Sequence, residues 1–334
     1  MSEARSEEEI SRLDFFEPNV SEAEASAALK RIARDESIKA YVQAEKPVHD
    51  ALLGAARRFI GGELLGECVE VAQRVNRRGH SVTIDHMGES TRDEAMAREA
   101  TEEFLRVVEA IGGGGLDSSV SLDLSHLGLV VDPELAFENA SRLASAAREA
   151  GLEVMVSMEG SERTDEVLSM YRRLSESFEN VGITLQAYLY RTPGDLEDAL
   201  TRPGKIRLVK GAFEEPEDVA MARGRGLDDA YRSFVERLLL SGHPTSVSTH
   251  DPAILEHADP FVRENGLEAG AAEFEMLYGV QEERLEKMRG LGYRTRVYLP
   301  YGTEWYLYLC HRLAEHPPNI YRAVTDAVDR SYSL

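Results

Sequence analysis

The sequence predicts an α/β fold: a closed (β/α)8 barrel of the TIM type with a helical extension at its N-terminus. From about residue 80, short apolar runs alternate with amphipathic stretches, a pattern typical of parallel strands joined by right-handed helical crossovers. Eight such repeats in a chain of 334 residues indicate a closed barrel, which usually takes about 250 residues, rather than an open sheet.

The predicted elements follow in chain order. Residues 1–62 form the helical extension, with Ser21 as a helix N-cap and Gly61-Gly62 at its end, and residues 63–334 form the barrel domain. The predicted strands are 81–87, 120–124, 152–158, 183–190, 206–209, 245–249, 272–276 and 294–299. The predicted barrel helices are 92–111, 133–150, 164–178, 193–200, 227–240, 253–264, 281–289 and 304–314.

Glycines 112–115 are predicted to form a flexible turn before the second strand. A dinucleotide-binding glycine loop has the opposite order, because it follows a strand and opens a helix. We therefore assign these glycines no ligand.

Composition excludes several classes of function. A net charge of −22 repels nucleic acid and anionic membranes. The two cysteines, Cys68 and Cys310, make neither a disulfide framework nor a zinc site by themselves. The N-terminal residues are charged and no apolar run approaches about 18 residues, so we expect no signal peptide and no membrane span. The expected compartment is the cytoplasm.

Candidate site residues lie at the ends of the predicted strands, since β/α barrels bind their ligands at the carboxyl ends of the strands. Polar residues at every strand end exceed what packing requires and indicate a site. They are Asp85, His86, Glu89, Asp123, Ser125, His126, Ser157, Glu159, Gln186, Tyr188, Arg191, Arg207, Lys210, Thr249, His250, Asp251, Glu275, Tyr278, Tyr298 and Tyr301. The histidines lack metal-binding spacing, so we expect no metal.

Arg207 and Lys210 flank one strand end in this acidic chain, and Gly211 and Ala212 follow. Small residues let the backbone approach a ligand. Buried cations need a counter-charge, which either an anionic ligand such as a phosphate or neighbouring carboxylates can supply. The aromatic residues of the last barrel helix are equally consistent with packing and with ligand contact: Trp305, Tyr306 and Tyr308.

Six segments together resemble the proline dehydrogenase family, in particular its short monofunctional bacterial members. They are DHMGE at 85–89, LQAYLYRT at 185–192, RLVKGA at 207–212, THDP at 249–252, EFEMLYG at 273–279 and RVYLPYG at 296–302. The resemblance implies a distorted barrel that binds FAD noncovalently and oxidises L-proline to pyrroline-5-carboxylate. A hydride would pass to flavin N5 and electrons then to a quinone, or alternatively to O2. A homo-oligomer is compatible with it.

The resemblance also implies roles for individual residues. The positions that match flavin contacts are Met158, Gln186, Arg207, Val209, Lys210, Gly211, Ala212, Thr249 and His250. Arg207 near N5 would stabilise reduced flavin, and Gln186 would bind the ring system. Tyr298 would pack on the substrate ring, and Glu89 would pair with an arginine that gates the site.

Three positions depart from the family pattern. The resemblance implies a lysine, an aspartate and an arginine where this chain has Asp123, Ser157 and His311; the second carboxylate-clamping arginine, Arg312, remains. One imidazole does not replace a bidentate guanidinium. With Glu89, these residues change the site from one net positive to one net negative charge.

We therefore expect oxidation of a C–N or related N-linked bond in a substrate other than free proline, with Asp123 or His311 as proton acceptor. The alternatives are a genuine L-proline dehydrogenase that relies on Arg312, and an FAD-binding pseudoenzyme.

Overall fold

Two compact units make up the chain in the computed structural model, which describes residues 21–88, 91–315, 317 and 319–328. The barrel unit is Arg57–Trp305, and the helical unit combines Met1–Ala56 with Tyr306–Leu334, as far as these are described. The prediction assigned residues 1–62 alone to the helical part. In the structure the C-terminal helices group with the N-terminal ones instead.

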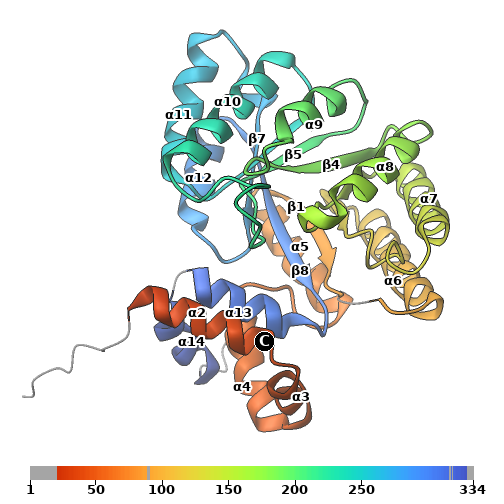
Figure 1. The fold of residues 1–334 in the computed structure, drawn as a ribbon, viewed down its shortest axis with the longest axis vertical. Helices are drawn as coiled ribbons and strands as arrows, with labels where there is room; N and C mark the ends of the chain where they lie inside the picture. The colour runs from red at the N-terminus through yellow and green to blue at the C-terminus, as the bar shows by residue number, and fades with distance from the viewer. Residues whose placement is uncertain (1–20, 89–90, 316, 318, 329–334) are drawn as a thin grey trace, which may run out of the picture. The chain divides into compact units, whose positions relative to one another are not determined.

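Eight parallel strands close into a barrel in chain order, which confirms the predicted fold (Figure 1). The strands are β1 (Ser81–His86), β2 (Ser118–Leu122), β3 (Val154–Val156), β4 (Val181–Gln186), β5 (Ile206–Val209), β6 (Thr245–Ser248), β7 (Glu273–Leu277) and β8 (Arg294–Tyr301). β8 closes on β1 with Ser81 opposite Arg296 and His86 opposite Tyr301. Parallel pairing brings all carboxyl strand ends to one end of the barrel, which we call the mouth.

Helices lie outside the strands of the barrel unit (Figure 1). They are α5 (Leu65–Arg77), α6 (Glu94–Gly114), α7 (Pro133–Glu149), α8 (Thr164–Ser175), α9 (Thr192–Ala199), α10 (Arg225–Ser241), α11 (Pro252–Glu264) and α12 (Glu282–Gly290), with short 3₁₀ turns at Ser161–Arg163 and Ala269–Ala271. Asp132 caps α7 and Asp251 caps α11. Each aspartate directly precedes the proline that opens its helix, and its side chain accepts a backbone N–H from the first turn.

The helical unit contains α2 (Glu22–Ala33), α3 (Glu36–Ala44), α4 (Lys46–Ala56), α14 (Asn319–Val328) and all but the first residue of α13 (Trp305–Glu315). Ser21 caps α2 through a capping box with Glu24, as predicted. The Tyr306 hydroxyl donates to the Ile32 carbonyl at 3.3 Å, and Trp305 is buried with its indole N–H on Glu63 at 2.8 Å. Packing therefore accounts for both aromatic side chains.

The prediction of a flexible turn at residues 112–115 was wrong for its first three glycines, because α6 continues through Gly114. Only Gly115 adopts the left-handed conformation, with φ 59°. The Leu116 N–H then bonds to the Ile111 carbonyl at 3.2 Å, so a single left-handed residue suffices to end the helix.

The barrel interior is polar, although TIM barrels are usually filled by branched apolar side chains. Near the amino ends of the strands, the buried Glu273 carboxylate bonds to Lys205 Nζ at 3.1 Å and to Arg296 Nε at 2.9 Å. Burial alone would raise the pKa of Glu273, but the charges of Arg296 and Lys205 prevail and lower it to about 2. This buried ion triad holds together three strands that are not all neighbours.

The turn after β5 requires glycine at position 211. Gly211 has φ 115°, and a Cβ atom added there would lie 2.4 Å from the Tyr188 ring. The turn is therefore pressed against β4's carboxyl end more closely than any larger residue permits.

We predict that Glu273→Gln lowers the free energy of unfolding by about 3–5 kcal/mol, because the buried Arg296 loses its paired carboxylate and Lys205 keeps only the half-exposed Glu153. Since the folded pKa of Glu273 lies near 2, below its ordinary 4.5, its stabilisation is complete above about pH 4.5 and declines as the pH falls toward 2. Urea unfolding at several pH values measures both effects. The control is Glu282→Gln, which breaks the exposed pair with Arg78 and should cost no more than about 1 kcal/mol. Equal losses in the two variants would contradict the role of the triad.

We predict that Gly211→Ala destabilises the protein by about 1–3 kcal/mol, since alanine meets both a left-handed backbone and the Tyr188 ring. Gly194→Ala is the matched control: a Cβ at this helical position meets nothing within 4 Å, so the change should be neutral or stabilise by up to about 1 kcal/mol. Thermal or urea unfolding compares the two. An unchanged stability of Gly211→Ala would show that the turn tolerates a side chain.

Candidate active site

Arg207 lies inside the barrel and is only 4% exposed. Strand alternation directs Ile206 and Leu208 into the hydrophobic layer under the helices and Arg207 into the lumen. Its Nε donates to Thr184 Oγ1 at 2.9 Å, and its Nη2 donates to Ser121 Oγ at 3.0 Å and to Ser157 Oγ at 3.2 Å. Hydroxyls on β2, on β4 and just after β3 thus fix one edge of the guanidinium.

The other edge of Arg207 is not satisfied by a hydrogen bond. Its buried Nη1 has no hydrogen-bond partner among the described residues, and the Glu275 carboxylate lies 3.6 Å away. Glu275 is itself held by three hydroxyls: Thr83 at 2.8 Å, Ser246 at 2.8 Å and Ser248 at 3.1 Å. A buried donor without an acceptor costs about 1–3 kcal/mol, so this site fits a ligand that presents an acceptor to the guanidinium.

Two carboxyl groups lie at the mouth near Arg207. The Tyr298 hydroxyl donates to Asp85 Oδ2 at 2.6 Å, and the Arg207 guanidinium lies 5.3 Å from the centre of the Tyr298 ring. Burial raises the pKa of Asp85 to about 6, against the opposing effects of Tyr298 and Arg207. Burial and the negative charge of Asp85 raise the pKa of Asp123 to about 7, opposed by a hydrogen bond from Ser157. These groups titrate where an enzyme acid or base is useful.

Lys210 is already paired in this structure. Its Nζ lies 2.5 Å from both Asp228 Oδ1, on α10, and Asp251 Oδ2, at the start of α11. For Lys210 the geometry therefore matches the alternative of neighbouring carboxylates. Arg207 is the cation of this segment that keeps a donor for a ligand.

The remaining predicted cofactor positions surround the mouth at the ends of β3 to β6. Gln186 Nε2 donates to the Glu159 carbonyl at 2.9 Å, and the Leu277 N–H donates to His250 Nε2 at 3.2 Å. Thr249 Oγ1 accepts the Asp251 N–H at 3.1 Å. Gln186, Thr249 and Met158 are buried, Val209 and Gly211 are half-buried, and Ala212 is exposed.

For three predicted substrate-site residues, a position relative to this cluster is not given by the structure. Glu89 lies outside the described residues. His311 and Arg312 lie on α13 in the helical unit. Arg312 stacks on the Tyr308 ring at 5.1 Å and bonds to Glu315 at 2.7 Å. The roles proposed for these three residues stay predictions.

Sequence analysis missed two residues that shape the site, Ser121 and Thr184, and gave no role to two others, Asp85 and Glu275. Asp85 and Glu275 were noted at strand ends without a role. Ser121 and Thr184 lie inside strands, and a period-two reading would have found them, since Ser121 shares a face with Asp123 two residues later. A buried guanidinium has five N–H donors, so the need for several acceptors around Arg207 was the signal that could have pointed to these hydroxyls.

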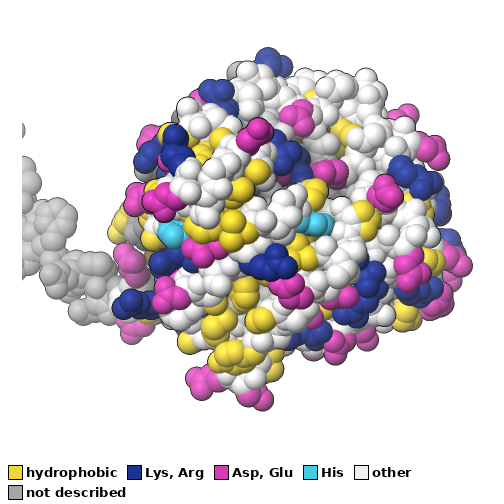
Figure 2. Space-filling model, turned by 90° about the horizontal axis from the view of Figure 1, so that it is seen from above, with side chains coloured by type: hydrophobic (Ala, Val, Ile, Leu, Met, Phe, Trp, Pro, Cys, Tyr) yellow, Lys and Arg dark blue, Asp and Glu magenta, His cyan; other side chains and the backbone are white. Residues whose placement is uncertain are grey.

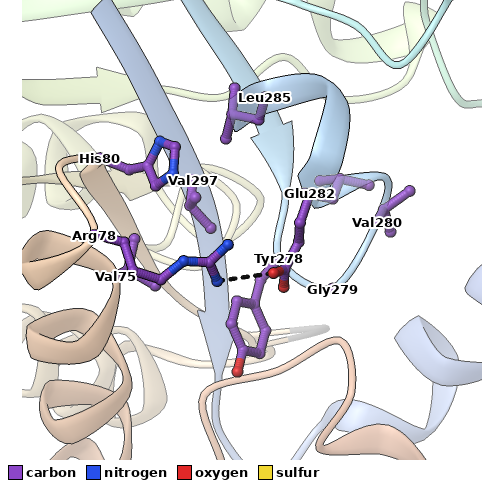
Figure 3. Close-up of a pocket in the computed structure, with 10 residues that line it drawn as sticks. Val75, Arg78, His80, Tyr278, Gly279, Val280, Glu282, Leu285 and Val297 are labelled. Atoms are coloured by element: carbon purple, nitrogen blue, oxygen red, sulfur yellow. Dashed lines mark hydrogen bonds and ion pairs between the residues drawn. The ribbon is translucent and has the colours of Figure 1, made fainter. Parts of the chain in front are cut away.

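A small cavity lies elsewhere, outside the barrel wall between α5, β8 and the loop from β7 to α12 (Figure 3). Its volume is about 20 Å³, room for roughly one water molecule. The Arg78–Glu282 pair, 2.8 Å apart, lines one side of it. The cavity is too small for a cofactor and does not contain the carboxyl groups of the mouth.

On the face that Figure 2 shows, acidic and basic side chains lie interspersed, so the net charge of −22 is not confined to one patch there. Among the described residues, none of the helices is long and apolar enough to cross a membrane.

The chain is similar in sequence and in fold to known proteins. The pattern that defines the family described as "Proline dehydrogenase" matches residues 68–319. The chain is 39% identical over 264 residues to "Proline dehydrogenase 1" of Bacillus subtilis subsp. natto, covering 79% of this chain and 87% of that protein. It is 36% identical over 282 residues to "Proline dehydrogenase" of Deinococcus radiodurans, covering 83% of this chain and 91% of that protein.

A solved structure shares the fold. The crystal structure of proline utilization A from Bdellovibrio bacteriovorus, inactivated by N-propargylglycine, superimposes with a TM-score of 0.73 at 21% identity. The match covers 83% of this chain and 35% of that longer one. Together with the barrel and the matched span of 68–319, these similarities show that the chain belongs to the proline dehydrogenase family of oxidoreductases.

Proposed function

We propose that the protein is an FAD-dependent oxidoreductase that oxidises the CH–NH bond of a proline-like secondary amine at the barrel mouth. The observation that carries this proposal is the buried Arg207, whose Nη1 keeps an unused hydrogen bond in a chain of this family. When bound, FAD would supply the two-electron acceptor that amino-acid side chains lack.

The residues of the mouth fit such a cofactor. Arg207 would donate through Nη1 to an acceptor on the isoalloxazine ring. The turn at Gly211 brings backbone close to the mouth without a side chain in the way. Met158, Gln186 and Thr249 add a buried, mainly uncharged wall, which excludes water from a flat aromatic ring.

The relatives favour L-proline as the substrate, since the proteins that are 36–39% identical over most of their length are named proline dehydrogenases. The half-buried Tyr298 ring would then pack against the pyrrolidine ring, and its hydroxyl is already fixed by Asp85. These relatives do not support the expectation that the substrate is an amine other than free proline.

A second candidate is an amine that carries no carboxylate. The observation that favours it is the pair of Asp85 and Asp123 beside one another at the mouth, because two carboxyl groups attract a cationic amine and repel a substrate carboxylate. A quinone is the proposed electron acceptor, with O2 as the alternative.

We predict that the purified protein binds FAD and that Arg207→Ala lowers its FAD affinity at least roughly 10-fold, the value of one charge-assisted hydrogen bond of about 1.5–3 kcal/mol. Flavin absorbance after dialysis, with titration of added FAD, measures this. The control is Arg237→Ala, which removes only the exposed pair with Glu197 and should leave FAD affinity unchanged. Full FAD affinity in Arg207→Ala, with the fold intact by circular dichroism, would refute the cofactor site.

We predict that anaerobic addition of L-proline bleaches the flavin of the wild-type protein. A panel of pyrrolidine, piperidine and acyclic secondary amines, each with and without a carboxylate, separates the two candidates. Faster bleaching by L-proline supports the first candidate, and faster bleaching by pyrrolidine the second. Reoxidation by a soluble quinone or by air then identifies the acceptor. If no amine of the panel bleaches the flavin, the proposed reaction is wrong.

A further inference from the structure

We propose that Asp85 and Asp123 act as one proton-sharing acid pair, which takes the proton from a protonated secondary amine bound at the barrel mouth. The inference rests on the proposed function and deepens it, because it states in which charge form the substrate arrives and where its proton goes. It decides between the two proton acceptors, Asp123 and His311, that the sequence left open.

The two carboxyl groups are placed by adjacent strands. Asp85, near the end of β1, lies opposite Ser121 of β2, and Asp123 follows Ser121 by two residues on the same face. Each carboxyl has a hydrogen-bonded support, Tyr298 for Asp85 at 2.6 Å and Ser157 for Asp123. Both side chains are half-buried, so they are screened from bulk water yet open toward the mouth.

Around Arg207, the carboxyl groups of the upper lumen outnumber the positive charge. Arg207 is the cation that acts on both carboxyls, but its guanidinium also lies 3.6 Å from the buried Glu275 carboxylate. With Glu275 ionised, full ionisation of Asp85 and Asp123 would leave three negative charges facing one positive charge. Like charges in a poorly hydrated site cannot both ionise cheaply, so one proton stays on the pair at neutral pH.

The other titratable groups of the barrel unit that act on the pair do not change this balance. Burial raises the pKa values of the Tyr298 and Tyr301 hydroxyls and of the Cys68 thiol, so all three stay neutral. Burial and the charge of Asp123 raise the pKa of Glu159. Among these described groups, Arg207 is the cationic one.

The proton transfer is balanced without a further reactant. One N–H bond of the ammonium breaks, its electron pair remains on nitrogen, and the proton forms an O–H bond on the ionised carboxylate of the pair. The pair thereby changes from one negative charge to none, and the amine becomes neutral. A neutral amine has the lone pair that must assist hydride loss from the adjacent carbon, so the pair prepares the substrate for oxidation.

The pH dependence of kcat/KM tests this role. In the wild-type enzyme kcat/KM should fall as the pH drops below about 6, where the pair takes up its second proton. In Asp123→Asn, Asp85 takes up its proton beside a neutral amide, much as it does beside a protonated Asp123, so this acid limb should stay near pH 6. The proton that the pair holds at neutral pH should instead be lost in this variant. The double variant Asp85→Asn/Asp123→Asn has no acceptor and should lose roughly 100-fold or more in kcat/KM.

The control is Asp117→Asn. Asp117 is exposed, precedes the same strand β2 at the opposite end of the barrel and accepts a bond from Ser81, so its removal changes the net charge equally but not the mouth. Its acid limb should coincide with that of the wild type. An acid limb and a kcat/KM that persist unchanged in the double variant would overturn the pair while leaving the proposed oxidation intact.

Infrared spectroscopy of the protein without substrate gives a readout that does not depend on activity. In difference spectra against the double variant, the carbonyl stretch of a protonated carboxyl group should be present at neutral pH in the wild type and in Asp117→Asn, and lost in Asp123→Asn. Its absence from the wild type would overturn the shared proton. If instead the band is present but no amine reduces the flavin, the proposed function fails, and the role as proton acceptor fails with it.

Discussion

The burial of one guanidinium, that of Arg207, is the constraint on which the barrel interior depends. A buried cation is tolerated only where hydrogen-bond acceptors and counter-charge surround it. Here Ser121, Ser157 and Thr184 supply hydroxyls and Glu275 supplies the charge. Positions that other barrels fill with branched apolar residues are therefore polar. The hydrophobic core lies instead between the strands and the helices that surround them.

Charge is arranged in layers along the barrel. At the amino ends of the strands, Glu273 is outnumbered by Lys205 and Arg296 and stays ionised. One layer higher, Glu275 faces Arg207. At the mouth the balance reverses, and Asp85 and Asp123 have raised pKa values. In the proposed proton transfer, a protonated amine would supply the positive charge at this uppermost layer. The lower ions are fully paired, whereas the raised pKa values of the upper acids support the proposed role in proton transfer.

Local patterns predicted the fold, whereas long-range pairing decided most of the site. Alternating apolar runs and amphipathic stretches predicted the barrel, which strand pairing in chain order confirms because each strand is followed by its own helix. The sequence did not predict that α6 extends through Gly114. Four consecutive glycines indicate that a helix ends nearby, but they do not show which of the four ends it. The partners of Lys210 come from the starts of two different helices, and the C-terminal helices join the N-terminal ones; neither fact has a local signature. The importance of Asp85 depends on Tyr298, 213 positions away.

The most direct test of the central claim is a crystal structure of the protein with FAD bound. Arg207 Nη1 has no hydrogen-bond partner among the described residues, so it should donate to the isoalloxazine ring while Nε and Nη2 keep their hydroxyl partners on β2, β4 and after β3. A structure in which FAD binds away from the mouth, or in which Nη1 turns to Glu275 and leaves the flavin without contact to Arg207, would contradict the claim that the polar barrel exists to hold this guanidinium for a flavin.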